Sequence, residues 1–349
     1  MSIQKYDTDP SRNLIRAEFK MLKHAMPIQV LGSFGTQKEQ PLNKTDTVVF
    51  RRLQPFNATA TEVPSITVAD FVTSEGVTPD SNTISYTDVT VTLRQYAILF
   101  KFSSKAALMY EDNIPDDMSK STGETMAEIA ELVCYGQIRG GSSVIYANGS
   151  TRIGVTSKVS LNTLRQAARN LESNRASRVT SKIRPGKEFG TTSVEPAFLV
   201  FIHTDCESDV RDLSGFARIE DYGSAVKPVH PREIGKVEQF RFITSPLFAP
   251  YLASGGTPGS TGMLDSTDST TALDVYPMII TAEDAWGHIG LKGHGHTSIT
   301  PTLVPASTIS HGNPSGMFGY VGANFWYQPA ILNQNWMTRL ETAVTDLDT

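Results

Sequence analysis

Cysteine, long apolar runs and surplus positive charge are all scarce in this 349-residue chain, and each scarcity excludes a class of protein. Two cysteines, Cys134 and Cys206, cannot build a disulfide scaffold and indicate a reducing compartment. The longest apolar run, 197–202, is far shorter than the roughly 20 residues that a membrane-spanning helix needs. Asp7 and Asp9 stand where a secretion signal requires apolar residues. We therefore expect a soluble chain at a cytoplasmic stage, with no membrane partner.

The net charge of −5 argues against a free-standing nucleic-acid binder, but the charge is unevenly distributed along the chain. Residues 1–60 carry +4 and residues 151–190 carry +7, whereas 61–150, 191–264 and 265–349 carry −7, −3 and −6. The basic segments either face a polyanion or pair with acidic segments, within one copy or between copies. The hydrophobic content of 39% is enough for a core and excludes a disordered chain.

No motif of nucleotide-using or nucleophilic enzymes is present: the chain lacks G-x-x-x-x-G-K, G-x-G-x-x-G, G-x-S-x-G and C-x-x-C. Cys206 follows His203 closely, but the acidic residues around it raise the pKa of a thiol instead of lowering it. The nearest set of metal ligands lies in a glycine-rich stretch that cannot preorganise them, and consists of Asp284, His288, His294 and His296. We expect no catalytic residue, no metal and no cofactor, and keep a metal-dependent hydrolase on those four residues as an alternative.

Hydrophobic periodicity predicts three amphipathic helices. The first covers 11–26 and ends at Pro27. The second covers 119–139, with Ser121 and Glu124 as a capping box and Gly140-Gly141 as a left-handed end. The third covers 160–174 and is capped by Ser160.

Residues 45–102 alternate apolar and polar side chains, which predicts two long strands joined by a threonine-rich excursion. A two-stranded ribbon is only marginally stable by itself in water. Such an arm either folds back on its own domain or lies across a neighbouring molecule, and the pattern leaves both possibilities open.

The second half alternates polar loops with buried segments. The basic stretch 175–193 is expected to be a mobile loop, and 253–272, rich in Gly, Ser and Thr, an exposed loop without packing potential. The run 197–202 is a buried-strand candidate, with a short helix after it and Gly215 at that helix's end. Residues 273–292 and the aromatic C-terminal stretch 317–344 return to ordered structure. The residues themselves thus predict a mixed α and β protein without a catalytic constellation.

The order of these pieces resembles the tailed-phage major capsid protein of the Hong Kong 97 type. The amino-acid sequences of several stretches are most similar to those of the major capsid proteins of N-four-like podoviruses. They include E-G-x-T-P from Glu75, E-I-G…R-F-I from Glu233 and R-L-E from Arg339, and they span 47–56, 74–106, 145–152, 203–223, 232–246, 274–293 and 319–341.

This resemblance implies an α+β capsid fold with an N-terminal arm, an extended β E-loop, a P-domain with a long spine helix and an A-domain. The implied divisions are 1–44 for the N-arm, 45–102 for the E-loop with flanking P-domain strands, 103–142 for the P-domain with its spine helix, 143–310 for the A-domain, and 311–349 for the return to the P-domain.

The implied function is a non-enzymatic major capsid protein, assembling with itself into hexamers and pentamers of an icosahedral shell around double-stranded DNA. Portal and scaffolding proteins are implied partners and a cement protein a possible one; the implied location is the virion capsid, with assembly in the host cytoplasm. The implied intersubunit residues on the E-loop are Arg51, Arg52, Glu75, Gly76, Pro79 and Asp80. The implied DNA-facing residues of the N-arm are Lys5, Arg12, Arg16, Lys20 and Lys23.

Two further expectations concern the same fold. Some relatives crosslink an E-loop lysine to a neighbouring subunit, but Lys101, at the base of the arm, is the only lysine between Thr47 and Phe102. We therefore expect no covalent crosslinking of the shell. An encapsulin-like compartment that encloses an enzyme is the alternative function within this fold, and the basic N-arm favours a phage shell.

Overall fold

The computed structural model describes residues 29–56, 62–73, 75–76, 78–79, 81–110, 113–184, 190–222, 228–258, 262–266, 269–295, 299 and 301–347. For 181–184, 190–194, 266 and 269–270 only the backbone is described. The helix expected at 11–26 and the five basic N-arm residues lie outside these ranges.

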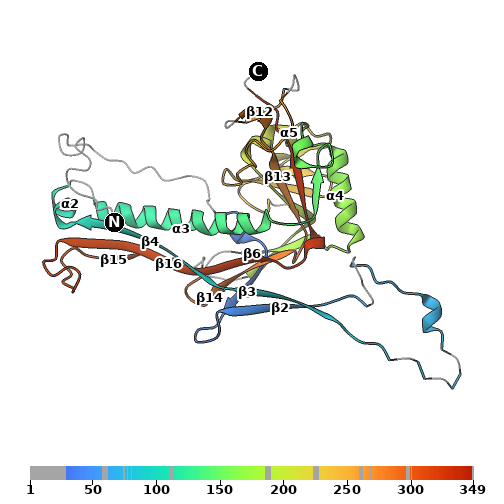
Figure 1. Ribbon diagram of the computed structural model, residues 1–349, viewed down its shortest axis with the longest axis horizontal. Helices are drawn as coiled ribbons and strands as arrows, with labels where there is room; N and C mark the ends of the chain where they lie inside the picture. The colour runs from blue at the N-terminus through green and yellow to red at the C-terminus, as the bar shows by residue number, and fades with distance from the viewer. Residues whose placement is uncertain are drawn as a thin grey trace.

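A five-stranded sheet forms a long platform (Figure 1). Its central strand, β16 (Phe318–Ile331), pairs antiparallel with β4 (Arg94–Ser103) from Phe318 opposite Ser103 to Tyr327 opposite Arg94. The other edge of β16 carries β15 (Thr302–Val304) and β14 (Trp286–Leu291), and β14 pairs in parallel with β1 (Thr36–Gln40). Side chains along β16 alternate between buried and partly exposed, as a strand with one covered face requires.

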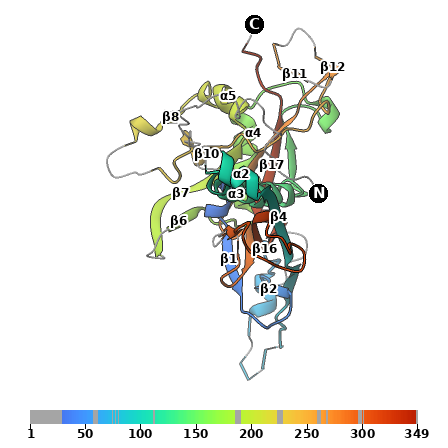
Figure 2. The ribbon, with the colours of Figure 1, turned by 90° about the vertical axis from the view of Figure 1, so that its left-hand side faces the viewer.

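The helix α3 (Ile114–Ile138) covers that face and runs along β4 and β16; Figure 2 views it nearly end-on above these strands. Its buried side includes Met126, Ala130 and Cys134. The predicted capping box is wrong, because Ser121 lies inside the helix and its carbonyl accepts the Thr125 hydroxyl. The helix begins earlier because proline is tolerated in a first turn, where Asp116 and Asp117 also favour the helix dipole.

The predicted left-handed end of this helix is also wrong. Arg139 continues in right-handed helical conformation, and neither Gly140 nor Gly141 has a positive φ. A Cβ at Gly141 would lie 2.6 Å from the Met337 Cε, so a larger residue there requires this flexible side chain to move aside. A short helix, α2 (Ser104–Met109), joins β4 to α3 at the far end of the platform.

An eight-stranded sheet forms the second body. Its strands are β5 (Val144–Tyr146), β17 (Met337–Thr342), β13 (Tyr276–Thr281), β7 (Gly190–Ile202), β10 (Phe240–Thr244), β9 (Glu233–Val237), β8 (Ala217–Arg218) and β6 (Val179–Arg184). The buried run 197–202 forms the inner part of β7, as predicted. The helix α4 (Leu161–Ser173) packs against this sheet, and Ser160 caps it through a reciprocal bond with Thr163.

Two predicted loops are structured. The stretch 175–193, expected to be a mobile loop, instead contributes β6 and the start of β7, an antiparallel hairpin visible in Figure 2. Within 253–272, β11 (Asp265–Ser266) pairs with β12 (Ser269–Leu273), and Gly255 and Gly256 are buried against the backbone of Leu273 and Val155. Glycine here permits close backbone approach, which a composition-based reading as an exposed loop misses.

The two sheets share one continuous core, in which Leu199 and Ile279 of the second sheet meet Met126 of α3 and Phe325 of β16. The short helices η5 (Thr204–Cys206) and α5 (Glu207–Arg211) follow β7, where the sequence predicts a short helix, and Gly215 beyond them has a φ of 83°. The chain crosses between the sheets twice near its end. It leaves the second sheet after β13 to form β14 of the platform, and it returns from β16 of the platform to β17 of the second sheet. The expected division at 310 does not coincide with either crossing.

Candidate intersubunit interface

A two-stranded arm leaves the platform and extends away from both sheets (Figure 1). It consists of β2 (Thr47–Leu53) and β3 (Tyr86–Thr92), paired antiparallel from Thr47 opposite Thr92 to Leu53 opposite Tyr86. Beyond the ribbon, the described residues contain a single turn of 3-10 helix, η3 (Val68–Phe71). We call residues 47–92 the arm. The paired strands β2 and β3 match the two strands that the alternating pattern predicts, and the long connection between them matches the predicted threonine-rich excursion.

The base of the arm is packed against the platform. Phe50 and Val91, together with Leu93 just beyond the arm, are buried against Ile289 of β14 and Ala330 of β16. On the same strands the opposite face is exposed, which is the alternation expected of a half-buried ribbon.

Ion pairs inside the chain hold the two expected arginines. Arg51 binds Asp88 across the ribbon through two bonds of 2.8 Å. Arg52 binds Glu62 at 2.8 and 3.1 Å, and its guanidinium lies over the Trp336 ring, with its Cζ 5.4 Å from the ring centroid.

Glu62 is itself buried and accepts a further hydrogen bond from the Asn335 amide at 3.3 Å. This bond ties the segment that follows β2 to the body of the protein. The hydrogen bonds of Arg52 and Asn335 lower the pKa of Glu62 against the opposing effect of its burial.

The other expected E-loop residues lie beyond the ribbon. Glu75, Gly76 and Pro79 are exposed, and Asp80 lies outside the described residues. Gly76 has a φ of 79°, a left-handed conformation that favours glycine, and a Cβ there would meet nothing within 4 Å. The structure thus places Glu75, Gly76 and Pro79 in solvent.

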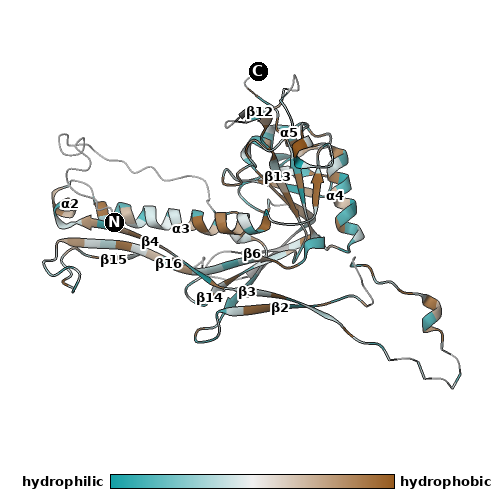
Figure 3. Ribbon diagram, in the orientation of Figure 1, coloured by the Kyte–Doolittle hydropathy of each residue, from teal (hydrophilic) through white to brown (hydrophobic). Residues whose placement is uncertain are grey.

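The arm exposes an unusual density of apolar side chains, seen as brown segments along β2 and η3 in Figure 3. Val68 and Val72 are 77% and 75% exposed. The remaining members of this arm patch are Val49, Leu53, Phe56, Val63, Ile66, Phe71, Ile84 and Tyr86. An extended segment that presents so many apolar groups to water is typical of a surface that another protein covers.

A second exposed apolar cluster caps the far end of the platform. It contains Leu108 and Met109 of α2 together with Ile309 and Met317, and the backbone N–H of Ser104 donates to the Met317 carbonyl at 2.8 Å. The loop between β15 and β16 is held by buried Asn313. Its amide nitrogen donates to the carbonyls of Thr308 and Phe318 at 3.1 and 2.7 Å, and its oxygen accepts the Met317 N–H at 2.9 Å. No pattern in the sequence identifies this cluster.

Replacing Asn313 with alanine should unfasten this loop without unfolding the platform. Several hydrogen bonds to one buried amide are lost, and each contributes about 1 kcal/mol, so local stability falls by about 2–3 kcal/mol. Hydrogen exchange of residues 305–317 measures the change. Asn324→Ala, at an exposed position of β16, is the matched control and should leave the loop's exchange unchanged. Equal exchange in both variants would contradict the role of Asn313.

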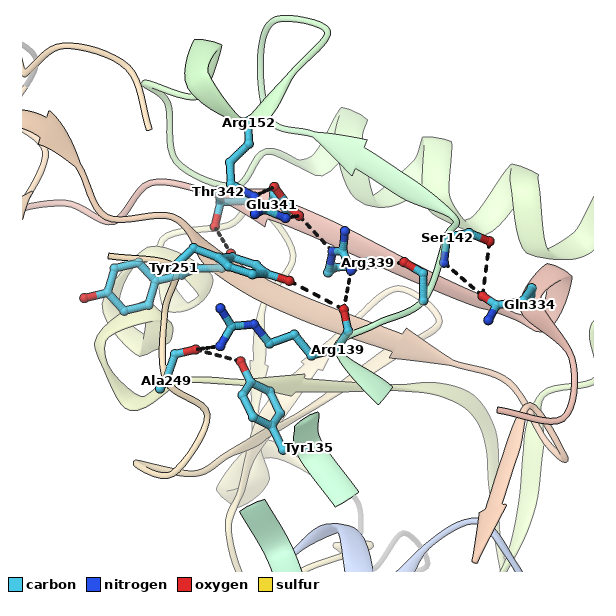
Figure 4. Close-up of polar contacts among 12 residues, drawn as sticks. Tyr135, Arg139, Ser142, Arg152, Ala249, Tyr251, Gln334, Arg339, Glu341 and Thr342 are labelled. Carbon is cyan, nitrogen blue, oxygen red and sulfur yellow. Dashed lines mark hydrogen bonds and ion pairs between the residues drawn. The ribbon is translucent and has the colours of Figure 1, made fainter. Parts of the chain in front are cut away.

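A buried charge network lies where the C-terminal end of α3, which we call the spine helix, meets the second sheet (Figure 4). Arg152 binds Glu341 of β17 through two bonds of 2.7 Å, and the Arg339 Nε donates to the same carboxylate at 2.8 Å. The Glu341 side chain is 0% exposed. Arg339 also donates to the carbonyls of Arg139 and Gly141 at the end of α3.

An aromatic ring completes this network. The Tyr251 ring lies 3.5 Å from the Cζ of Arg139 and 3.5 Å from that of Arg152, so two cations stack on it. Arg339 and Glu341 are two positions apart on β17 and share a face of the strand. That spacing is the only signal in the sequence that could have found the network, since Arg139, Arg152 and Tyr251 come from distant segments.

The residues of the hydrolase alternative do not converge. His288 is buried in β14 between the rings of Trp286 and Tyr327, with centroids 5.5 and 5.8 Å away. Asp284 accepts the Thr36 hydroxyl at 2.5 Å at the molecule's surface, His294 is exposed in a turn, and His296 lies outside the described residues. Within the described part of the chain, no three His, Cys, Asp or Glu side chains are grouped to hold a metal.

Both cysteines are core residues. Cys134 faces the platform from α3, and Cys206 lies in the core of the second sheet. Burial raises the pKa of both thiols well above the ordinary value, which disfavours the reactive thiolate. In the described ranges, no helix has the length and apolarity needed to cross a membrane.

Comparison with solved structures identifies the fold. No family model matches the sequence, and no curated protein matches it. Among solved structures, the chain is similar to the capsid of Ralstonia phage GP4, with a TM-score of 0.66 and 10% identity over 96% of this chain and 97% of that one. It is also similar to the head of Helicobacter pylori bacteriophage KHP40 (TM-score 0.60, 8% identity, 98% of each chain) and to the capsid of cyanophage Pam1 (0.58, 9%, 95% and 97%). The likeness extends over nearly the whole of each chain, so this protein has the tailed-phage capsid fold of the Hong Kong 97 type.

Proposed function

We propose that the chain is a major capsid protein whose copies form hexamers and pentamers of an icosahedral shell around double-stranded DNA. One observation carries the proposal: on a chain with this fold, the arm holds its apolar patch in solvent, uncovered by any of the residues that the structure describes. The proposal includes a role as a shell component and not as an enzyme.

The arm suits a contact in which each copy both gives and receives. A two-stranded ribbon is marginal alone, and among its described residues the apolar packing is concentrated at the base. When the arm of each copy lies on the next copy, the contact is heterologous, because the two subunits use different surfaces. Such contacts form a closed ring when the rotation from one subunit to the next brings the last subunit back to the first. Arg51 and Arg52 stiffen the ribbon for this contact through Asp88 and Glu62, while Glu75, Gly76, Pro79 and Asp80 reach the neighbour.

The proposed DNA contact rests on the N-arm. Its basic residues, Lys5, Arg12, Arg16, Lys20 and Lys23, would neutralise phosphates on the inner face of the shell without reading base sequence. Portal and scaffolding proteins, and a cement protein, belong to the same proposal, as do the virion location and assembly in the host cytoplasm. The closer kinship with N-four-like podoviruses rests on the sequence stretches alone.

Sedimentation followed by electron microscopy tests the proposed function. The chain, expressed alone and together with its own virus's scaffolding protein, should give closed shells, tubes or capsomer rings in the fast fraction. A stable 38.1 kDa monomer under both conditions and with crowding agents would contradict the proposal. Nucleic acid, and not an enclosed enzyme, in shells from infected cells separates a phage capsid from a compartment.

Denaturing electrophoresis of mature particles should show one band near 38.1 kDa and no ladder above it. Residues 47–92 contain no lysine. Lys38 lies against the base of the arm, with its Nζ 4.4 Å from the centroid of the Phe50 ring, and Lys101 lies in β4, with its Nζ 3.9 Å from the centroid of the Phe318 ring. Without an accessible lysine on the arm, an amide crosslink to a neighbour cannot form there. A ladder that persists after reduction and boiling would overturn this expectation.

A further inference from the structure

The spine helix holds the start of the described chain through one buried carboxylate. Glu131 of α3 is 2% exposed, and its two oxygens accept the Leu31 N–H at 2.9 and 3.1 Å. Leu31 begins the 3-10 turn η2 (Leu31–Ser33), whose preceding residue, Val30, gives it no side-chain cap. Glu131 therefore replaces a local N-cap from a helix 100 residues away in the sequence.

The held segment is wedged into the core. Val30, Leu31 and Phe34 are buried, and the Phe34 ring lies 5.6 Å from that of Phe201. Gly35 has a φ of 79° and passes so close to the Trp286 ring that a Cβ would be 3.0 Å from it. Residues 30–35 thus lead directly into β1, and the N-arm joins the body at this wedge.

The environment of Glu131 opposes its negative charge. Burial raises the pKa of its carboxyl to about 7 from 4.5, although backbone N–H groups of 30–32 and Arg232 lower it. The charged and titratable groups that face it or its immediate neighbours are Arg232 and His230 before β9, Cys134 and Tyr135 on α3, Tyr327 on β16, Tyr96 on β4, and His288 on β14.

Release of the segment would reverse that environment. If residues 30–34 leave, water reaches Glu131 and its pKa returns toward 4.5, so the closed state binds a proton more tightly than the open state. By linkage, closure is favoured at low pH and loses that advantage as the pH rises from 4.5 through 7.

We propose that Glu131 is a proton-sensitive clasp that fastens residues 30–34 to the spine helix more tightly in mild acid than above neutrality. The clasp is a property of one chain and does not depend on the capsid function. It links the acidity of the surroundings to how firmly residues 30–34 are held, through a carboxylate whose two oxygens accept the Leu31 N–H.

The size of the effect follows from the two pKa values. Between pH 5 and pH 8, the opening equilibrium of residues 30–34 should rise by roughly fifty- to a hundredfold. Glu131→Gln removes the titrating group while keeping its shape, so its opening should change with pH by less than about threefold.

Hydrogen exchange of the full-length chain tests the clasp. Amides 30–35 are followed from pH 5 to pH 8 in one assembly state, with rates corrected for intrinsic exchange. His230→Gln is the matched control, because the His230 ring lies 5.9 Å from that of Phe34 and titration of this histidine is the competing explanation.

The outcomes separate cleanly. A steep rise in wild type and in H230Q, together with a flat profile in E131Q, supports the clasp. A wild-type profile that is flat overturns it whether or not the variants fold. A steep profile in E131Q that disappears in H230Q also overturns it and assigns the pH dependence to the histidine.

Discussion

Replacing Glu341 with alanine should lower the free energy of unfolding by about 3–5 kcal/mol. The substitution leaves the Arg152 and Arg339 guanidiniums without their carboxylate, and Arg339 is almost fully buried. Removing one partner of a buried ion pair strands the other charge away from water, which costs far more than the pair itself contributes. An arginine guanidinium keeps its proton across the ordinary pH range, so neither arginine can escape the cost by becoming neutral.

Denaturant unfolding of the unassembled chain measures this prediction. Glu172→Ala is the matched control, because Glu172 pairs with Arg178 at 2.7 Å on the exposed side of α4 and both side chains are at least 42% exposed. Surface pairs contribute at most about 1 kcal/mol, so the control should stay close to wild type. Equal losses in the two variants would show that the Glu341 network does not hold the spine helix to the second sheet.

Replacing Val68 or Val72 with aspartate should abolish assembly while leaving the chain folded. Both side chains are already exposed in one copy, so the free energy of unfolding should change by no more than about 0.5 kcal/mol. In the proposed contact, each aspartate would be buried without a partner, at a cost of several kcal/mol. Since each 1.4 kcal/mol is a factor of ten, every contact around a ring would weaken by roughly a hundredfold or more.

The yield of rings and shells after sedimentation measures this second effect, alongside thermal unfolding of the same samples. Leu347→Asp is the control, because Leu347 is 72% exposed but lies near the C-terminus, outside the arm. It should assemble as wild type does. Normal shells from V68D and V72D would mean that the outer arm is not an assembly contact.

Local signals in the sequence were sufficient for elements that depend on their own side chains. The Ser160 cap and apolar stripe of α4, the buried run of β7 and the alternation in β2 and β3 each appear where they are predicted. In these elements, capping, periodicity and burial all act over a few neighbouring residues, and they agree with one another.

Elements fixed by distant contacts were not predictable in this way. Along α3, a capping-box pattern at Ser121 competes with a helix that continues through it, and the continuing helix, packed on β4 and β16, prevails. The β6–β7 hairpin has a polar and basic composition typical of a loop, yet sheet pairing with the buried end of β7 extends it. Amino-acid composition describes which side chains a segment carries, but it does not show whether the backbone of that segment pairs with another strand.

The candidate site divides along the same line. The arm and its paired ribbon follow from the alternating pattern, but the bonds of Arg52 with Glu62 and of Glu62 with Asn335 require the folded base of the arm. Glu131 and Asn313 each act on backbone groups that no side-chain pattern identifies. Their roles therefore emerge only from the three-dimensional structure.

A cryo-electron microscopy reconstruction of the assembled particle tests the central claim most directly, because it shows where the arm lies. The account predicts rings of six and five subunits in which residues 66–86 of each copy lie on the next copy, with Val68 and Val72 buried. Particles in which those residues fold against their own subunit or remain in solvent would contradict it.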